Sequence, residues 1–130
     1  ALVDADLIIL GPGSFLTSVI PPLLVRDIAN GIIESKAHCV FIDNIVKENS
    51  PAGKLSIDEK LQWIEHNLSC QPIDSIIAPH NVTSSILPVD NFDLSSAKVA
   101  HYHDKQKLIA ALEHCLTDTA KQPRKKTVNC

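Results

Sequence analysis

The sequence lacks several features that would assign it to a class directly. It has no apolar run approaching the roughly 20 residues of a bilayer-spanning helix, so no membrane span is expected. Its 12 Lys and Arg are outnumbered by 15 Asp and Glu, giving a formal net charge of −3, so nucleic acid is not favoured as a partner. Hydrophobic residues make up 45% of the chain and charged residues 21%, which excludes a disordered chain. These absences leave an ordinary globular protein.

Cysteine and methionine are also sparse. The 4 cysteines lie too far apart for a Cys-x-x-Cys redox or zinc motif, and they form no dense disulfide framework. We therefore predict a cytoplasmic protein, and nothing at the amino terminus resembles a signal peptide. There is no methionine at all, and a strand pattern begins within the first ten residues. We expect the sequence to be the carboxyl-terminal piece of a longer protein.

The length of 130 residues allows one compact domain. We predict a single α/β domain over residues 1–118. Four of the 12 basic residues fall in the last ten positions, which contain no Asp or Glu. Residues 119–130 are therefore predicted to form a basic, disordered tail.

Short apolar runs predict the strands. Residues 7–10, 39–42 and 75–78 are wholly or nearly wholly apolar, which is typical of strands buried on both faces of a parallel sheet, and residues 98–100 form a weaker fourth. Residues 79–97 are rich in Ser, Asn, Pro and Asp. We expect this stretch to be irregular, with room for one short extra element.

Helical patterns lie between the strands. One helix is predicted after the paired prolines, with an apolar residue at every fourth position from Leu24 to Ile32. A capping box formed by Ser56 and Glu59 predicts the start of a second helix, and Asp104 is expected to cap the last one. The alternation predicts an α/β fold: an open, mainly parallel, Rossmann-like three-layer sheet with crossover helices.

The turn after the first strand is the most informative candidate site. Ligands of open α/β sheets bind beyond the carboxyl ends of the strands, where Gly11-Pro12-Gly13 lies. Its backbone N–H groups and the hydroxyls of Ser14, Thr17 and Ser18 suit a phosphate. The same residues also fit a plain strand-to-helix turn, and both interpretations stay open. The turn lacks the lysine of a Walker loop, and Leu16 replaces the third glycine of a dinucleotide fingerprint.

Polar residues also follow the later strands. Asp43 and Asn44 follow the second strand, where an amide suits ribose or sugar hydroxyls, although the pair also fits the start of a loop. His101 and His103 have the alternating spacing of metal ligands on a strand, but without a third ligand no metal site is predicted. Asp104 fits a helix cap better than a catalytic carboxylate. No residue is assigned a catalytic role.

Several of these residues resemble the signature of the CofD-like proteins, also called the gluconeogenesis factor family. The match comprises residues 5–14 with the hydroxyl residues and proline that follow, Asp43-Asn44 after the second strand, and His103-Asp104 before the last helix. Residues 45–50 depart from it, reading Ile-Val-Lys-Glu-Asn-Ser in place of the Thr-Gln-x-Gly-Glu-Thr of many bacterial members. Members also begin with a glycine-rich loop that is missing here. The resemblance therefore implies the carboxyl-terminal half of such a protein.

The family has two functional branches. Bacterial gluconeogenesis factors, which this chain resembles more, bind UDP-N-acetylglucosamine and support gluconeogenic growth and normal cell shape, with no established reaction. Other members are transferases that move a phospholactyl-type group onto a deazaflavin alcohol with the help of a divalent metal. The resemblance implies a nucleotide-sugar-binding regulatory protein. The alternative is a 2-phospho-L-lactate transferase-type phosphotransferase.

The resemblance also implies the ligand, the cofactors and the contact residues. A nucleotide sugar or another nucleotide is the expected ligand, and no cofactor is expected except Mg²⁺ for the transferase. A homodimer is one possible assembly. The predicted ligand-binding residues are Gly11, Pro12, Gly13, Ser14, Thr17, Ser18 and Asn44, with Asp43, His103 and Asp104 as further candidates.

Overall fold

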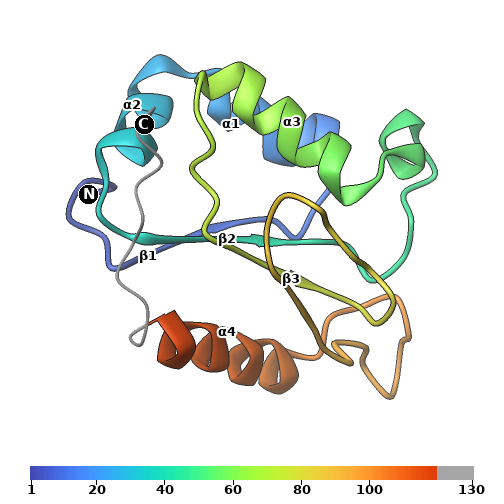
Figure 1. The fold of residues 1–130 in the computed structure, drawn as a ribbon. Coiled ribbons are helices and arrows are strands. Elements are labelled where there is room, and N and C mark those ends of the chain that lie inside the picture. The colour runs from blue at the N-terminus through green and yellow to red at the C-terminus, as the bar shows by residue number, and fades with distance from the viewer. Residues whose placement is uncertain (120–130) are drawn as a thin grey trace.

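The computed structural model describes the backbone of residues 1–119 and the side chains of residues 1–117 (Figure 1). Of the predicted tail at 119–130, residues 120–130 lie outside the described residues. The prediction about that tail is therefore not tested by the structure.

Four parallel strands form one sheet in the order β1-β2-β3-β4. The strands are β1 (Leu7–Leu10), β2 (His38–Ile42), β3 (Ser75–Ala78) and β4 (Val89–Asn91). The first three confirm the apolar runs as strands.

The prediction of a fourth strand at residues 98–100 was wrong, and the fourth strand lies earlier in the chain. The strand is β4, a short element within the irregular stretch, where Val89 pairs with Ile76 and Asn91 with Ala78. The Asn91 amide also donates to the carbonyl oxygen of Pro79 at 2.9 Å, which ties this strand to the end of β3. Residues 96–102 instead close a turn, because the Tyr102 N–H donates to the Val99 carbonyl oxygen.

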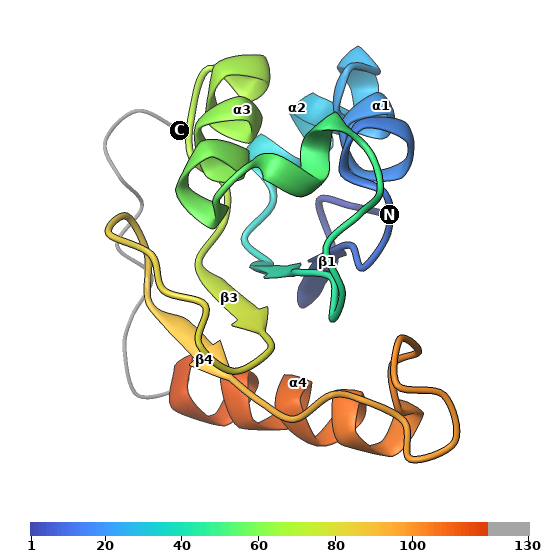
Figure 2. The ribbon, with the colours of Figure 1, turned by 90° about the vertical axis from the view of Figure 1, so that its right-hand side faces the viewer.

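Helices cover both faces of the sheet. The helices α1 (Ile20–Leu23), α2 (Arg26–Glu34) and α3 (Ile57–Leu68) lie on one face, and α4 (Lys105–Thr119) lies on the other (Figures 1 and 2). A π-helical turn at Phe15–Val19 leads into α1, and a 3₁₀ turn at Pro51–Lys54 precedes α3. The predicted three-layer, open parallel α/β architecture is confirmed.

The first predicted helix is divided in two. The segments Phe15–Leu23 and Arg26–Glu34 are bent by 77° relative to each other, because Val25 has extended backbone angles. The bend leaves Leu24 63% exposed, although the four-residue spacing predicted it on the buried stripe with Ile32. Spacing alone did not show where the helix is interrupted.

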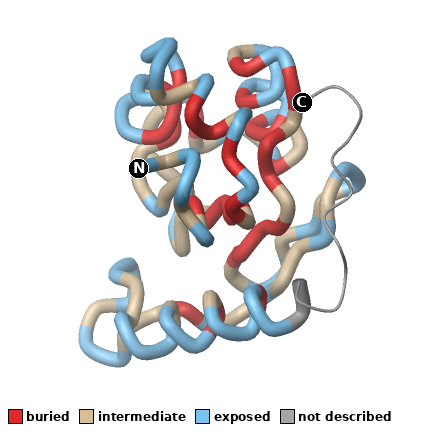
Figure 3. Tube along the Cα trace, turned by 90° about the vertical axis from the view of Figure 1, so that its left-hand side faces the viewer, coloured by how far each residue is buried: buried red, intermediate tan, exposed pale blue. Residues whose placement is uncertain are grey.

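Each face of the sheet has its own hydrophobic core, since neighbouring strand residues point to opposite sides. Figure 3 shows buried residues along the central strands and along the segments that cover them. Phe41 and Ile76 pack under α1 to α3, together with Phe15 and Leu61. The other core, against α4, comprises Val40, Ile42, Ile77, Leu94, Ala111 and Cys115. Burial on both faces explains why the central strands β2 and β3 are almost wholly apolar.

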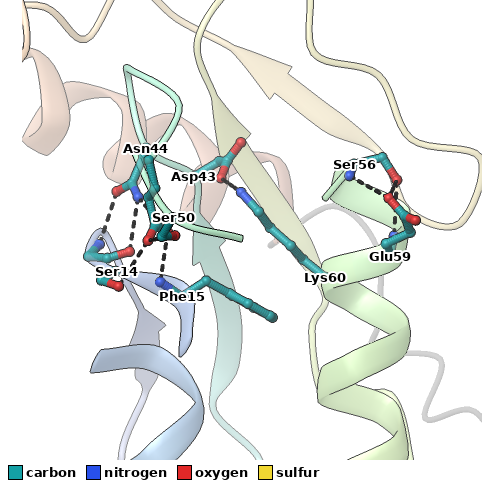
Figure 4. Close-up of polar contacts among 10 residues, drawn as sticks. Ser14, Phe15, Asp43, Asn44, Ser50, Ser56, Glu59 and Lys60 are labelled. Atoms are coloured by element: carbon teal, nitrogen blue, oxygen red, sulfur yellow. Dashed lines mark hydrogen bonds and ion pairs between the residues drawn. The ribbon is translucent and has the colours of Figure 1, made fainter. Parts of the chain in front are cut away.

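The predicted capping box of α3 is present. The Ser56 hydroxyl accepts from the Glu59 N–H at 3.2 Å, and the Glu59 carboxylate accepts from the Ser56 N–H at 2.7 Å (Figure 4). This fixes the first turn of α3, and therefore which of its side chains point toward the sheet.

No single helix among the described residues has both the length and the apolar character needed to cross a membrane. The bent pair Phe15–Leu23 and Arg26–Glu34 meets those criteria only when its two parts are taken together.

Candidate functional site

Gly11 places the loop after β1 directly against the end of β2. Its φ angle is +80°, and a Cβ at this position would lie 2.5 Å from the carbonyl oxygen of Ile42. Both conditions require glycine. The peptide bond between Gly11 and Pro12 is cis. The close approach of Gly11 to Ile42 brings Gly13 beside the residues that follow β2.

Asn44 binds this loop through both ends of its amide. Its Oδ1 accepts from the Gly13 N–H at 3.1 Å, and its Nδ2 donates to the Gly13 carbonyl oxygen at 3.0 Å. Two of the predicted site residues, from the ends of different strands, are thus joined directly. In this conformation the Gly13 N–H is used within the protein.

Glu48 is the central acceptor of the loop, and it was missed by the sequence analysis. Its Oε1 accepts from the Phe15 N–H at 2.7 Å, and its Oε2 accepts from the Ser14 hydroxyl at 2.9 Å. The Ser50 hydroxyl and the Asn44 amide also donate to it, at 3.1 and 3.3 Å (Figure 4 shows these donors). A carboxylate therefore occupies donors that the sequence predicted for a phosphate.

The charge state of Glu48 follows from these contacts. Burial by itself raises the pKa of its carboxyl group. The hydrogen bonds from Phe15, Ser14 and Ser50, together with the positive charge of Lys60, outweigh burial and hold the pKa below its ordinary value of 4.5. Glu48 is therefore an anion at neutral pH.

Asp43 forms a partly buried ion pair with Lys60 of α3. The Lys60 Nζ lies 2.6 Å from the Asp43 Oδ1, and the two side chains are 9% and 14% exposed (Figure 4). The sequence contained a signal for this pair, because Lys60 shares the buried helical stripe of Ile57, Leu61 and Ile64. A lysine on such a stripe needs an anionic partner.

A cavity of about 220 Å³ opens beside this network at the carboxyl edge of β1 and β2. Ligand sites of open α/β sheets lie at this edge. The volume is below the roughly 300–1,000 Å³ of pockets that enclose a whole small molecule. The cavity therefore has room for one part of a ligand. Its lining residues are Pro12, Gly13, Asn44, Ile45, Val46, His101 and His103.

His103, one of the lining residues, carries an unsatisfied polar atom. Its Nε2 is buried and has no hydrogen-bond partner among the described residues. Burial lowers the pKa of the imidazole, and a hydrogen bond with the Asp43 backbone opposes this only in part. The imidazole is therefore neutral at neutral pH, and a neutral imidazole has one nitrogen that accepts a hydrogen bond from a hydroxyl or N–H donor.

The structure gathers only part of the predicted site. Pro12, Gly13, Asn44 and His103 line the cavity, and His101 joins them although it is not part of a strand. Gly11 and Ser14 belong to the same loop, whereas Asp43 binds Lys60. Thr17 and Ser18 are exposed on the π-helical turn and do not line the cavity. Asp104 caps α4, accepting from the N–H groups of Gln106 and Lys107.

The described residues do not fit a divalent metal. No group of three or more His, Cys, Asp or Glu side chains within residues 1–117 is arranged to hold one. The carboxylates next to the lining residues in sequence or by hydrogen bond, Asp43, Glu48 and Asp104, are bound by Lys60, by the loop donors and by the first N–H groups of α4. No catalytic step is therefore assigned to a metal.

A serine, a histidine and an aspartate meet at the opposite end of the sheet. His38 Nε2 lies 2.9 Å from the Ser75 Oγ, and His38 Nδ1 lies 3.6 Å from the Asp74 Oδ2. Ser75 is only 6% exposed, and the Asp74 carboxylate also accepts from the Cys39 N–H at 2.8 Å. The serine hydroxyl is not accessible to a substrate. These contacts fix the start of β2 and β3.

The fold and the cavity at the carboxyl ends of β1 and β2 define a class of protein. It is an open parallel α/β domain with a polar cavity beyond its first two strands. The family model described as 2-phospho-L-lactate transferase CofD matches residues 1–120. The chain belongs to the CofD family.

Relatives named "Putative gluconeogenesis factor" support this assignment. The chain is 38% identical to one from Pasteurella multocida over 120 residues, covering 89% of this chain and 39% of the relative. It is 40% identical to one from Vibrio cholerae over 119 residues, covering 89% and 40%. The chain thus spans about 40% of the length of these relatives.

A solved structure shares the fold. The crystal structure of a UPF0052 family member from Bacillus halodurans matches with a TM-score of 0.66 and 24% identity, covering 85% of this chain and 44% of that one. The parallel α/β architecture is therefore that of a known crystal structure.

Proposed function

We propose that this chain forms part of a nucleotide-sugar site, with UDP-N-acetylglucosamine as the ligand. The protein would then be a cytoplasmic regulator of carbon metabolism and cell shape rather than a catalyst. The observation that carries the proposal is the cavity lined by Gly13, Asn44 and His103, the last of which has a buried Nε2 without a partner among the described residues. Similarity to gluconeogenesis factors supports the same assignment.

Each end of such a ligand has a partner of suitable chemistry. The neutral His103 Nε2 accepts from a sugar or ribose hydroxyl, or from an amide N–H. The diphosphate lies toward the loop donors at Ser14 and Phe15. Because the cavity of about 220 Å³ holds only part of a nucleotide sugar, residues outside this chain complete the site. We therefore expect this chain alone to bind weakly.

The second candidate is a 2-phospho-L-lactate transferase-type phosphotransferase, favoured by the description of the matching family model. This function needs Mg²⁺, whereas the carboxylates near the cavity are already bound by Lys60 and the loop donors. We rank this function second for that reason.

Thermal-shift titration distinguishes the two functions. UDP-N-acetylglucosamine, NAD, and a guanine nucleotide with Mg²⁺ are titrated separately to millimolar concentration. A ligand of the native state raises the melting temperature according to its concentration and Kd. We expect the largest increase with UDP-N-acetylglucosamine. A response only to NAD, or only to the guanine nucleotide with Mg²⁺, contradicts the proposal.

His103→Asn tests the cavity itself. Asparagine is neutral and polar but lacks the second ring nitrogen of the imidazole. We expect the affinity for UDP-N-acetylglucosamine to fall about tenfold, the equivalent of one hydrogen bond. His66→Asn, on the exposed face of α3, is the matched control and should bind as the wild type does. Equal affinities for the two variants would exclude His103 from the site.

The homodimer stays a prediction that light scattering would test.

A further inference from the structure

The loop after β1 holds a negative charge that belongs to the protein itself. Glu48 reaches back from the segment after β2, and its two carboxylate oxygens accept from Phe15, Ser14, Ser50 and Asn44. Lys60 adds a favourable charge from α3. One backbone amide, two hydroxyls, one side-chain amide and one cation are the usual surroundings of a bound phosphate.

These donors cannot serve two anions at the same time. The Phe15 N–H and the Ser14 hydroxyl each have a single proton to donate, and both point at Glu48 at 2.7 and 2.9 Å. A phosphate brought beside the carboxylate would also meet a like charge. The anionic part of a ligand and Glu48 therefore compete for one position.

We propose that Glu48 is a built-in competitor, which occupies the anion-binding donors of the loop beside the cavity until a ligand displaces it. This inference rests on the proposed function, because it concerns the same site. Displacement needs no change in the sheet, since Glu48 belongs to the segment between β2 and the 3₁₀ turn at Pro51–Lys54. The segment would move away from Ser14 and Phe15, while Lys60 keeps its partner Asp43.

The competing explanation is that Glu48 only shapes the loop. The two explanations predict opposite effects of one substitution. If Glu48 competes with the ligand, removing its charge tightens anion binding. If Glu48 holds the donors in place for the ligand, removing its charge weakens binding.

The experiment compares Glu48→Gln with the wild type. Glutamine keeps the size of the side chain and one acceptor oxygen but removes the charge. Inorganic pyrophosphate and UDP-N-acetylglucosamine are titrated by calorimetry into both proteins, with the exposed Glu65→Gln on α3 as the charge-matched control. We expect Glu48→Gln to bind pyrophosphate about tenfold more tightly or better, since a charge-assisted hydrogen bond no longer opposes it. Unchanged or weaker binding by this variant, or no pyrophosphate binding by either protein, overturns the inference.

An NMR measurement on the wild type does not depend on any variant folding. Pyrophosphate is titrated while the amide resonances of Phe15 and Gly13 are followed. We expect the Phe15 amide to shift in proportion to saturation, because its acceptor changes from a carboxylate to a phosphate. A stationary Phe15 resonance at saturation overturns the inference.

The two proposals can fail separately. If pyrophosphate binds more tightly to Glu48→Gln but UDP-N-acetylglucosamine binds to neither protein, the competition stands and the nucleotide-sugar proposal is wrong. If UDP-N-acetylglucosamine binds both proteins equally and leaves Phe15 unshifted, the function stands and the competition is wrong.

Discussion

The ion pair between Asp43 and Lys60 should contribute strongly to stability, and Asp43→Asn tests this. The substitution keeps the shape of the side chain but leaves the Lys60 ammonium, 9% exposed, without its partner at 2.6 Å. Removing one member of a buried pair costs about 3–5 kcal/mol, because the remaining charge is poorly solvated. Both side chains retain some exposure and Glu48 still attracts Lys60, so we take the lower end, about 3 kcal/mol.

Urea denaturation followed by circular dichroism measures this loss directly. In a thermal melt, the same loss of about 3 kcal/mol in the free energy of unfolding would lower the melting temperature by roughly 12 °C for a domain of this size. The double variant Asp43→Asn/Lys60→Met should recover most of the stability, since it removes the uncompensated charge.

The pair between Lys107 and Asp93 is a matched control. Its Nζ–Oδ2 distance is also 2.6 Å, but its side chains are 41% and 58% exposed. Solvent screens such a pair, so Asp93→Asn should lower stability far less than Asp43→Asn does. If the two substitutions had equal effects, or if Asp43→Asn cost less than about 1 kcal/mol, as for an exposed pair, the argument from burial would be refuted.

Three further predictions concern the loops around the site. Gly11→Ala should lower the free energy of unfolding by more than about 1 kcal/mol, because Gly11 has a φ of +80° and a Cβ there would lie 2.5 Å from the Ile42 carbonyl oxygen. Gly13→Ala is the control: a Cβ there would have its nearest neighbour at 3.4 Å, so this variant should lose less stability in the same urea titration. Ser56→Ala should cost about 1 kcal/mol through loss of the helix cap, measured as a shift in the urea midpoint. Glu48 has a lower pKa in the folded state than in the unfolded chain, so its stabilisation is complete above pH 4.5 and is lost as the pH falls through the folded pKa. The stability difference between the wild type and Glu48→Gln should therefore shrink on acidification from pH 7 to pH 3, and a constant difference would contradict the assigned pKa direction.

Local patterns in the sequence were sufficient for most of the fold. The apolar runs at β1, β2 and β3 and the capping box of Ser56 and Glu59 depend on neighbouring residues, so they could be predicted without knowing the rest of the molecule. The errors occurred where strand pairing or the backbone conformation, and not the apolar pattern, decides. Only pairing with β3 makes β4 a strand, and only the bend at Val25 exposes Leu24.

The candidate site divides in the same way. Gly13 and Asn44 could be selected from the sequence because ligands gather where parallel strands end. His103 was selected through the family resemblance, since the strand predicted before it is absent. Glu48 could not be selected, since 33 residues separate it from the Phe15 amide that it binds.

The sequence by itself therefore determined the parallel α/β class and the edge of the sheet where the candidate site lies. These depend on the order of apolar runs and on glycines with few allowed alternatives. Only the tertiary structure decided which side chains occupy that edge. Hydrogen bonds and ion pairs between segments far apart in the chain form only where folding brings those segments together. The number of residues between two segments does not predict their distance in the folded protein.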